Sequence, residues 1–310
     1  MTKDMVHIVS WLLTRKCNLK CSYCRIVRNY RDIPEEYPQI SLYHKNEMST
    51  EMILKGLDSF KKHNSSSFHI LYGGEPLLRK DLPEIVHFCN TNDINYTIIT
   101  NNSNDVQPMI ENLLTKVNYI TGLTSSVDPV IFDKAATGDR VEKSIAGLKR
   151  LTEFIGIIKD LVAEITVDND TLPFLFPLVE KLTELGINSD ITFIDIAKSK
   201  YYDFSNVTDK NLLVEKSQYV QEQLKKIIDA DLNVHMAEVL LPKIYNDLPS
   251  NMDCEIEKNI HNLSIDADGT IRLCLRIRGV DTPRRINLSN LFEKDFSLNP
   301  RLKPMLTRDK

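Results

Sequence analysis

Two patterns of apolar and polar positions alternate along the first 230 or so residues of the chain. Short runs rich in apolar and β-branched residues predict strands, and longer segments with apolar residues every three or four positions predict helices. The predicted strands are Val6–Leu13, Phe68–Tyr72, Asn95–Thr100, Tyr119–Val127, Leu161–Val167 and Asp190–Ile196. The predicted helices are one that begins at Ser49 or Thr50, then Leu82–Asn90, Val106–Lys116, Glu142–Phe154, Phe174–Leu185 and Asn211–Ile228. This alternation predicts an α/β fold with a parallel sheet.

The pattern changes after Pro242. Two short alternating runs, Leu263–Ile265 and Thr270–Leu275, flank an Asp-Gly pair at Asp268 and Gly269, which indicates a β-hairpin. We therefore expect a large domain over residues 1–242 and a small β-containing extension over residues 243–310. A chain of 310 residues agrees with that division.

Composition narrows the classes of protein. The chain is 42% hydrophobic and 26% charged, as in ordinary globular proteins, and its net charge of −4 gives no general attraction to nucleic acid. The apolar run Val6–Leu13 is too short to cross a membrane and has no small-residue cleavage site after it. Six cysteines are too few for a disulfide scaffold. We expect a cytoplasmic, reducing location with neither a membrane nor a nucleic-acid partner.

Three of the cysteines, Cys17, Cys21 and Cys24, lie within eight residues directly after the first predicted strand. Thiolates are soft ligands for zinc or for iron–sulfur clusters. A structural zinc site normally takes four ligands, so zinc would need a distant residue such as His44 or His63. A four-iron cluster on three cysteines would instead leave one iron with an open position for a substrate or cofactor.

The Cys-x3-Cys-x2-Cys spacing resembles that of the radical SAM superfamily, and further motifs extend the resemblance over roughly residues 6–200. Gly73-Gly74-Glu75-Pro76 matches the family's Gly-Gly-Glu-Pro turn after the second strand, Thr100-Asn101-Asn102-Ser103 is close to its Thr-Asn-Gly stretch, and Ser126-Val127-Asp128 fits its Ser-x-Asp. Asn102 stands where the family usually has glycine. The resemblance implies a partial (β/α)6 TIM-like barrel with the site at the carboxyl ends of the strands.

The resemblance also implies the residues of the site. Cys17, Cys21 and Cys24 would bind a [4Fe–4S] cluster whose open iron chelates the methionine part of S-adenosylmethionine (SAM). Backbone carbonyls around Tyr72–Gly74 would accept hydrogen bonds from the amino group of SAM, and Glu75 would accept a further one. The remaining cofactor-binding candidates are Tyr23 and Ile194 near the adenine, Asn101 at the third strand, and Ser126 and Asp128 for the ribose or carboxylate.

Cys254 precedes the predicted hairpin, and Cys274 lies in its second run, five positions after Gly269. This pattern resembles the start of the SPASM or twitch extension, where cysteines bind an auxiliary iron–sulfur cluster. No cysteine follows Cys274, so three alternatives stay open. A non-cysteine ligand such as His235 or His261, or the substrate, completes the cluster; the cluster has been lost; or one of the two thiols donates a hydrogen atom to a substrate radical. The sixth cysteine, Cys89, lies on an apolar helix face and is expected in the core.

The function implied by the resemblance is that of a radical SAM enzyme. It would reductively cleave SAM to a 5′-deoxyadenosyl radical that abstracts a hydrogen atom from a peptide or protein, with electrons from a flavodoxin or ferredoxin. A small alcohol, sugar or nucleotide-derived substrate is the alternative within the class. A non-catalytic iron–sulfur or zinc-binding protein is the alternative outside it.

Overall fold

The structure, a computed structural model, describes residues 8–19, 47–103, 105–127, 137–167, 171–193, 218–234, 262–272 and 286–287. The strands are β1 (Ile8–Leu12), β2 (Phe68–Tyr72), β3 (Asn95–Thr100), β4 (Gly122–Val127), β5 (Leu161–Val167), β6 (Asn188–Phe193), β7 (Asn262–Ile265), β8 (Thr270–Arg272) and β9 (Ile286–Asn287). The helices are α3 (Thr50–His63), α4 (Leu82–Thr91), α5 (Gln107–Lys116), α6 (Thr137–Thr152), α7 (Leu175–Glu184) and α8 (Gln218–Asp229), with short 3-10 turns η2 (Pro76–Leu78) and η4 (Leu172–Phe174).

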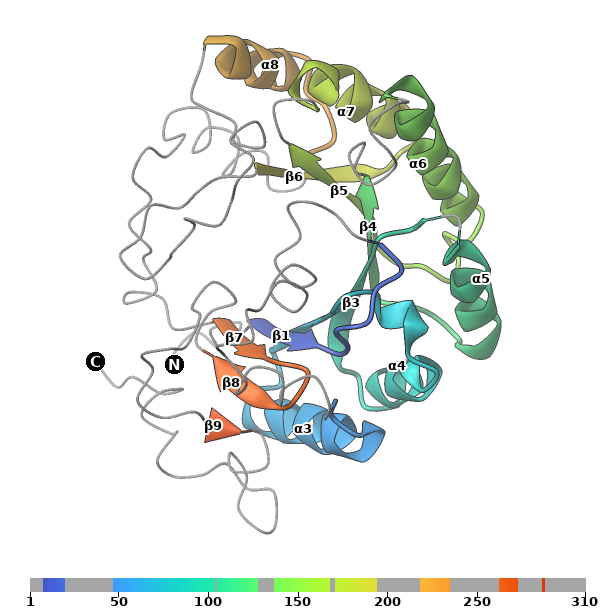
Figure 1. Ribbon diagram of the computed structural model, residues 1–310, viewed down its shortest axis with the longest axis vertical. Helices are drawn as coiled ribbons and strands as arrows, with labels where there is room; N and C mark the ends of the chain where they lie inside the picture. Colours follow the sequence, from blue (N-terminus) through green and yellow to red (C-terminus); the bar gives the residue numbers. More distant parts are fainter. Residues whose placement is uncertain are drawn as a thin grey trace, which may run out of the picture.

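The described strands form one sheet in the order β6-β5-β4-β3-β2-β1-β7-β8-β9. Its first seven members are parallel, and β8 and β9 add antiparallel pairs. The sheet curves, and helices α3 to α8 lie along its outer side (Figure 1). This confirms the predicted α/β class and the partial TIM-like barrel. No described helix is both long and apolar enough to cross a membrane.

The core lies between the outer face of the sheet and the helices. Trp11 of β1 is fully buried there, and its Nε1 donates to Nδ1 of His69 in β2 at 2.9 Å. The Phe60 ring of α3 meets the indole edge-on at 5.8 Å between centroids. Burial lowers the pKa of His69 to about 3, so the imidazole is neutral at physiological pH and accepts the indole proton. These contacts bind β1, β2 and α3 together.

Most of the predicted element bounds agree with the structure. β2, β3 and β5 have the predicted limits, and Ser49 caps α3 by accepting a hydrogen bond from the Met52 main-chain N–H. Three predicted starts were wrong: β4 begins at Gly122 and not at Tyr119, and α6 begins at Thr137 and not at Glu142. β6 begins at Asn188 and not at Asp190. Asn and Ser are poor strand formers, but pairing of Asn188 with Val162 of β5 draws them into the ladder.

The predicted C-terminal hairpin is present. Gly269 adopts a positive φ of 82°, its N–H donates to the Asp266 carbonyl at 2.8 Å, and Ile265 pairs with Ile271 across β7 and β8. β7 also pairs in parallel with β1, where Trp11 lies opposite Ile265. The hairpin therefore continues the sheet of the barrel. The division of the chain at residue 242 stays a prediction.

Candidate functional site

Cys17 lies just beyond the carboxyl end of β1. It belongs to residues 13–19, called here the cysteine segment, which run beside the turn after β2. The Gly74 N–H donates to the Thr14 carbonyl at 2.7 Å, and the Glu75 N–H donates to the Lys16 carbonyl at 2.8 Å. These bonds extend the parallel contact of β1 and β2 past the ends of both strands. The first cysteine and the Gly-Gly-Glu-Pro turn are thereby joined through their backbones.

The cysteine segment lies so close to this turn that only glycine fits at its first two positions. A Cβ on Gly73 would lie 2.5 Å from the Thr14 carbonyl oxygen, and a Cβ on Gly74 would lie 2.2 Å from the Lys16 carbonyl oxygen. Both distances are far below van der Waals contact. The opposing atoms belong to the backbone, which cannot move aside by a change of side-chain rotamer. The sequence predicted that carbonyls of this backbone bind the amino group of SAM. The structure shows a close approach to the protein's own chain.

The Glu75 side chain is fully buried and connects its own turn to the end of β3. One carboxylate oxygen accepts from the Leu77 N–H at 3.1 Å, the other accepts from the Asn101 N–H at 2.8 Å, and the Thr100 hydroxyl is 3.0 Å from both. Burial raises the pKa of Glu75 to about 7, although these hydrogen bonds lower it. These donors hold the carboxylate and fix β3 against the turn, and the expected hydrogen bond between Glu75 and SAM stays a prediction.

Asn101, at the end of β3, reaches the cysteine segment through its side chain. Its Nδ2 donates to Asn18 Oδ1 at 2.9 Å and lies 3.8 Å from Cys17 Sγ as a second donor contact. The Leu19 N–H also donates to that sulfur, at 3.4 Å. N–H groups directed at a sulfur are typical surroundings of metal-bound thiolates. Cys17 therefore fits the role of an iron ligand.

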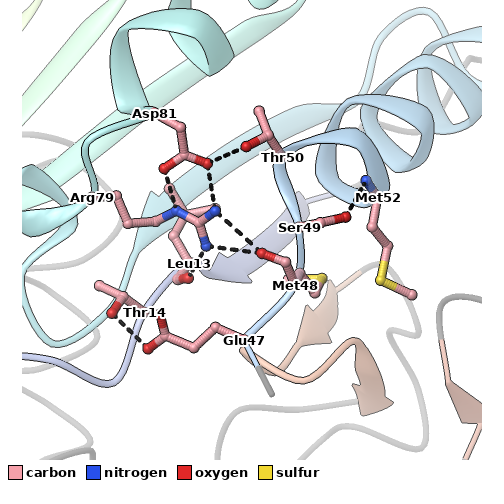
Figure 2. Close-up of polar contacts among 9 residues, drawn as sticks. All are labelled: Leu13, Thr14, Glu47, Met48, Ser49, Thr50, Met52, Arg79 and Asp81. Carbon is pink, nitrogen blue, oxygen red and sulfur yellow. Dashed lines mark hydrogen bonds and ion pairs between the residues drawn. The ribbon is translucent and has the colours of Figure 1, made fainter. Parts of the chain in front are cut away.

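The Arg79 side chain joins segments that lie next to the cysteine segment (Figure 2). Its guanidinium pairs in two places with the Asp81 carboxylate, at 2.9 and 2.5 Å, and donates to the Leu13 carbonyl at 2.7 Å and to the Met48 carbonyl at 3.2 Å. Thr50 donates to the same Asp81 carboxylate at 2.6 Å. One side chain thus links the end of β1, the start of α3 and the segment before α4.

Glu47 fixes the first residues of the cysteine segment. Its carboxylate accepts from the Thr14 hydroxyl at 2.7 Å, drawn in Figure 2, and from the Arg15 N–H at 3.0 Å. The Arg15 side chain extends to the C-terminal hairpin, where Nη2 is 2.7 Å from Asp266 and 3.8 Å from Asp268. The Arg15 and Asp266 side chains are both only 6% exposed, so this ion pair is a buried link between the segment after β1 and the C-terminal hairpin.

Ser126 of β4 and Tyr72 of β2 both alternate with buried core residues and so face the inner side of the curved sheet. Ser126 lies in register with Glu164 of β5, and Glu164 lies in register with Asp190 of β6. Burial and the nearby Asp190 raise the pKa of Glu164. The sequence reasoning missed this acidic pair, because only strand register brings the two residues together.

The described residues include part of the predicted site. Cys17, Tyr72, Gly73, Gly74, Glu75, Asn101 and Ser126 are described; Cys21, Tyr23, Cys24, Asp128, Ile194, Cys254 and Cys274 lie outside the described residues, as do His44, His235 and His261. Within the described ranges, no three His, Cys, Asp or Glu side chains gather as a metal site.

Cys89 is fully buried, as predicted, and burial raises the pKa of its thiol to about 12.

Sequence comparison finds a matching family and similar proteins. The family model described as "Radical SAM superfamily" matches residues 11–170. The chain is 36% identical to Fe-coproporphyrin III synthase of Methanosarcina barkeri over 103 residues, which are 32% of this chain and 22% of that protein. It is 24% identical to GTP 3′,8-cyclase of Vibrio atlanticus over 276 residues, which are 85% of this chain and 77% of that protein. The first of these matches therefore spans under a quarter of the relative.

Solved structures show the same fold. SuiB of Streptococcus suis bound to S-adenosylmethionine superposes with a TM-score of 0.64 at 16% identity, covering 98% of this chain and 68% of SuiB. SuiB bound to its precursor peptide SuiA superposes with a TM-score of 0.62 at 16% identity, covering 92% of this chain and 62% of SuiB. At this level of identity, the agreement concerns the fold alone.

Proposed function

The chain belongs to the radical SAM superfamily, and from this premise we propose that it modifies a peptide or protein by radical chemistry. Membership of this family implies a [4Fe–4S] cluster and S-adenosylmethionine as cofactors. When bound, these cofactors supply a 5′-deoxyadenosyl radical that abstracts a hydrogen atom from the substrate. The protein's part is to hold, orient and enclose them.

One observation carries the proposal. Cys17, the Gly73-Gly74-Glu75 turn and Asn101 follow three neighbouring strands and are joined by direct hydrogen bonds at one edge of the sheet. Catalytic groups of α/β barrels gather at this carboxyl edge. The described parts of three of these motifs thus lie together in the structure, which supports the proposal.

In this proposal Cys17, Cys21 and Cys24 hold the cluster. The carbonyls of Tyr72, Gly73 and Gly74 bind the amino group of SAM, and Glu75 keeps that turn against Asn101. The other proposed SAM contacts are Ser126, which faces the inner side of the sheet, together with Tyr23, Asp128 and Ile194.

The likeness of the fold to SuiB, a protein solved with a precursor peptide bound, supports a peptide substrate. A second candidate, a nucleotide-derived substrate, is supported by the similarity to GTP 3′,8-cyclase over 85% of this chain. We further propose a flavodoxin or ferredoxin as the electron donor and a cytoplasmic location, since a reducing compartment preserves thiolate ligands.

Anaerobic reconstitution with iron and sulfide, then addition of dithionite and SAM, tests the chemistry. We expect 5′-deoxyadenosine from the wild type and none above background from Cys17→Ala. Equal, background levels in both proteins would contradict the proposed function and favour a non-catalytic metal-binding role.

Iron analysis of the same samples tests the C-terminal cysteines. About four irons per chain would indicate the radical cluster alone. A clearly higher number that falls in a Cys254→Ala/Cys274→Ala variant would indicate an auxiliary cluster. If the number is about four, loss of product without loss of 5′-deoxyadenosine in a single Cys254→Ala or Cys274→Ala variant would support a hydrogen-atom donor.

The substrate class is tested with the reconstituted protein and two probes. Short peptides encoded by neighbouring coding regions are incubated with protein and SAM, and GTP is incubated in parallel. A mass change of one peptide in mass spectrometry, absent with Cys17→Ala, supports the peptide class. Turnover of GTP alone would favour the nucleotide class.

A further inference from the structure

We propose that Asn101 is a positioning residue that raises the reduction potential of the cluster by donating a hydrogen bond to the sulfur of Cys17. The inference rests on the proposed function, because it requires an iron–sulfur cluster bound by Cys17. The observation behind it is the contact between Asn101 Nδ2 and Cys17 Sγ, at 3.8 Å.

The orientation of the Asn101 amide is fixed by its neighbours. Its Oδ1 accepts from the Ser103 N–H at 3.0 Å, and its Nδ2 donates to Asn18 Oδ1 at 2.9 Å. Asn18 Nδ2 in turn donates to the Ser103 hydroxyl at 2.8 Å. If the amide were reversed, an oxygen would face Asn18 Oδ1 and a nitrogen would face the Ser103 N–H, and both bonds would be lost. The second hydrogen of Nδ2 is therefore the one directed at the sulfur.

The backbone of Asn101 is held as well as its side chain. The Asn101 N–H donates to the buried Glu75 carboxylate at 2.8 Å, and Thr100 bonds to that carboxylate through its hydroxyl. Asn101 thus has its main chain fixed by the Gly-Gly-Glu-Pro turn and its side chain fixed by the cysteine segment. Such surrounding hydrogen bonds orient metal ligands and adjust the metal that they hold.

A donor beside a cluster ligand stabilises the reduced state, which carries more negative charge on its sulfurs. Loss of that donor makes reduction less favourable. Aspartate at this position has the same shape but no donor, so it also makes reduction less favourable, and its negative charge adds to the effect. Asn101 therefore sets how strong a reductant the cluster requires, independently of any contact with SAM.

The test is a redox titration of the reconstituted protein without SAM, followed by the EPR signal of the reduced cluster. We expect a more negative midpoint potential in Asn101→Ala, and a larger fall in Asn101→Asp. For Asn101→Asp the expected tenfold fall in the reduction equilibrium constant equals about 59 mV for a one-electron couple. Asn112→Asp, on an exposed turn of α5, is the matched control and keeps the wild-type potential.

Unchanged potentials in Asn101→Ala and Asn101→Asp, with the cluster bound, overturn the role of Asn101 and leave the proposed function intact. A wild-type protein that binds no four-iron cluster contradicts both. If the variants hold too little iron for titration, wild-type protein labelled with ¹⁵N in the asparagine side chains decides. A ¹⁵N coupling to the reduced cluster in pulsed EPR supports the contact, and its absence overturns it.

Discussion

Gly73 and Gly74 illustrate how little room single residues have at this site. Each lies against a carbonyl of the cysteine segment, so a methyl group at either position must push two backbones apart. The requirement for glycine comes from close approach between protein segments and not from a positive φ, because neither glycine has one.

Gly74→Ala should therefore lower the free energy of unfolding by about 1–3 kcal/mol, the usual cost of overpacking. It should also lower the iron bound per chain after reconstitution, because Lys16 and Cys17 must move. Urea denaturation and iron analysis measure the two effects. Gly156→Ala is the control: a Cβ there meets no atom within 4 Å, and its stability should stay within about 1 kcal/mol of wild type.

Glu75 leads to a prediction about pH. Because burial raises its pKa from 4.5 to about 7, the folded protein holds this proton over a range in which the unfolded chain has released it. The contribution of Glu75 to stability is therefore full below about pH 4.5 and falls as the pH rises to about 7. The loss amounts to about 3 kcal/mol.

The comparison is between wild type and Glu75→Gln, by urea denaturation at several pH values. Gln cannot titrate, so between pH 4.5 and 7 the wild type should lose more stability than the variant does. Glu75→Gln should also be less stable at acidic pH, because its amide donor would face an N–H of Asn101 or Leu77. Parallel pH profiles of the two proteins would contradict the burial effect.

At the level of elements, β1, α3 and the start of α4 meet at one guanidinium. Carbonyl groups at the end of a strand and before a helix lie outside the regular main-chain hydrogen bonds of those elements. Arg79 supplies donors to two of them, Leu13 and Met48 (Figure 2). Ser49 and Thr50 fix the first turn of α3 beside it. The entry to the cysteine segment therefore depends on a side chain from a different strand–helix unit.

Arg79→Ala should lower the free energy of unfolding by about 3 kcal/mol, because two carbonyls and the partly buried Asp81 carboxylate lose a charged donor. Arg79→Lys should recover only part of this, since an ammonium cannot reproduce the paired geometry. Thermal or urea unfolding gives both values. Arg150→Ala, on the exposed end of α6, should stay within about 0.5 kcal/mol of wild type, and a similar loss in this control would refute the prediction.

Across the whole molecule, the sheet joins the beginning of the chain to its C-terminal part. β7 completes the far side of β1, and the ion pair of Arg15 with Asp266 fixes the cysteine segment to the hairpin. Contacts between segments about 250 residues apart close a long loop, and they repay that entropic cost only when both segments are in place. Integrity of the site should thus depend on the hairpin.

Asp266→Ala should leave the Arg15 charge without its 2.7 Å partner and should cost about 3 kcal/mol of stability, with a loss of bound iron. Asp268→Ala is the matched comparison, because its carboxylate is 3.8 Å from the same guanidinium and should matter less. Urea unfolding and iron content after reconstitution give the order of the two variants. The opposite order would show that the shorter pair is not the one that stabilises the site.

The sequence by itself determined the α/β class, most element bounds and the order of the motifs. These follow from local causes: the apolar period, the Ser49 cap, the Asp-Gly turn before β8, and the spacing of Cys17, Cys21 and Cys24. It also placed Cys89 in the core, because apolar helix positions face the sheet. The sequence also predicted Cys17, Glu75 and Asn101 as site residues, because each belongs to a short motif whose members lie within a few positions of one another.

The tertiary structure alone decided what those residues touch. Asn101 had been grouped with the SAM contacts, yet its amide is directed at Cys17, 84 positions away in the chain. Glu75 bonds to β3 and its own turn, and Arg15 finds Asp266 at a separation of 251 positions. Such long-range contacts depend on strand register and on how distant segments are brought together in the fold. Neither leaves a local pattern in the sequence. The acidic pair of Glu164 and Asp190 was missed for the same reason.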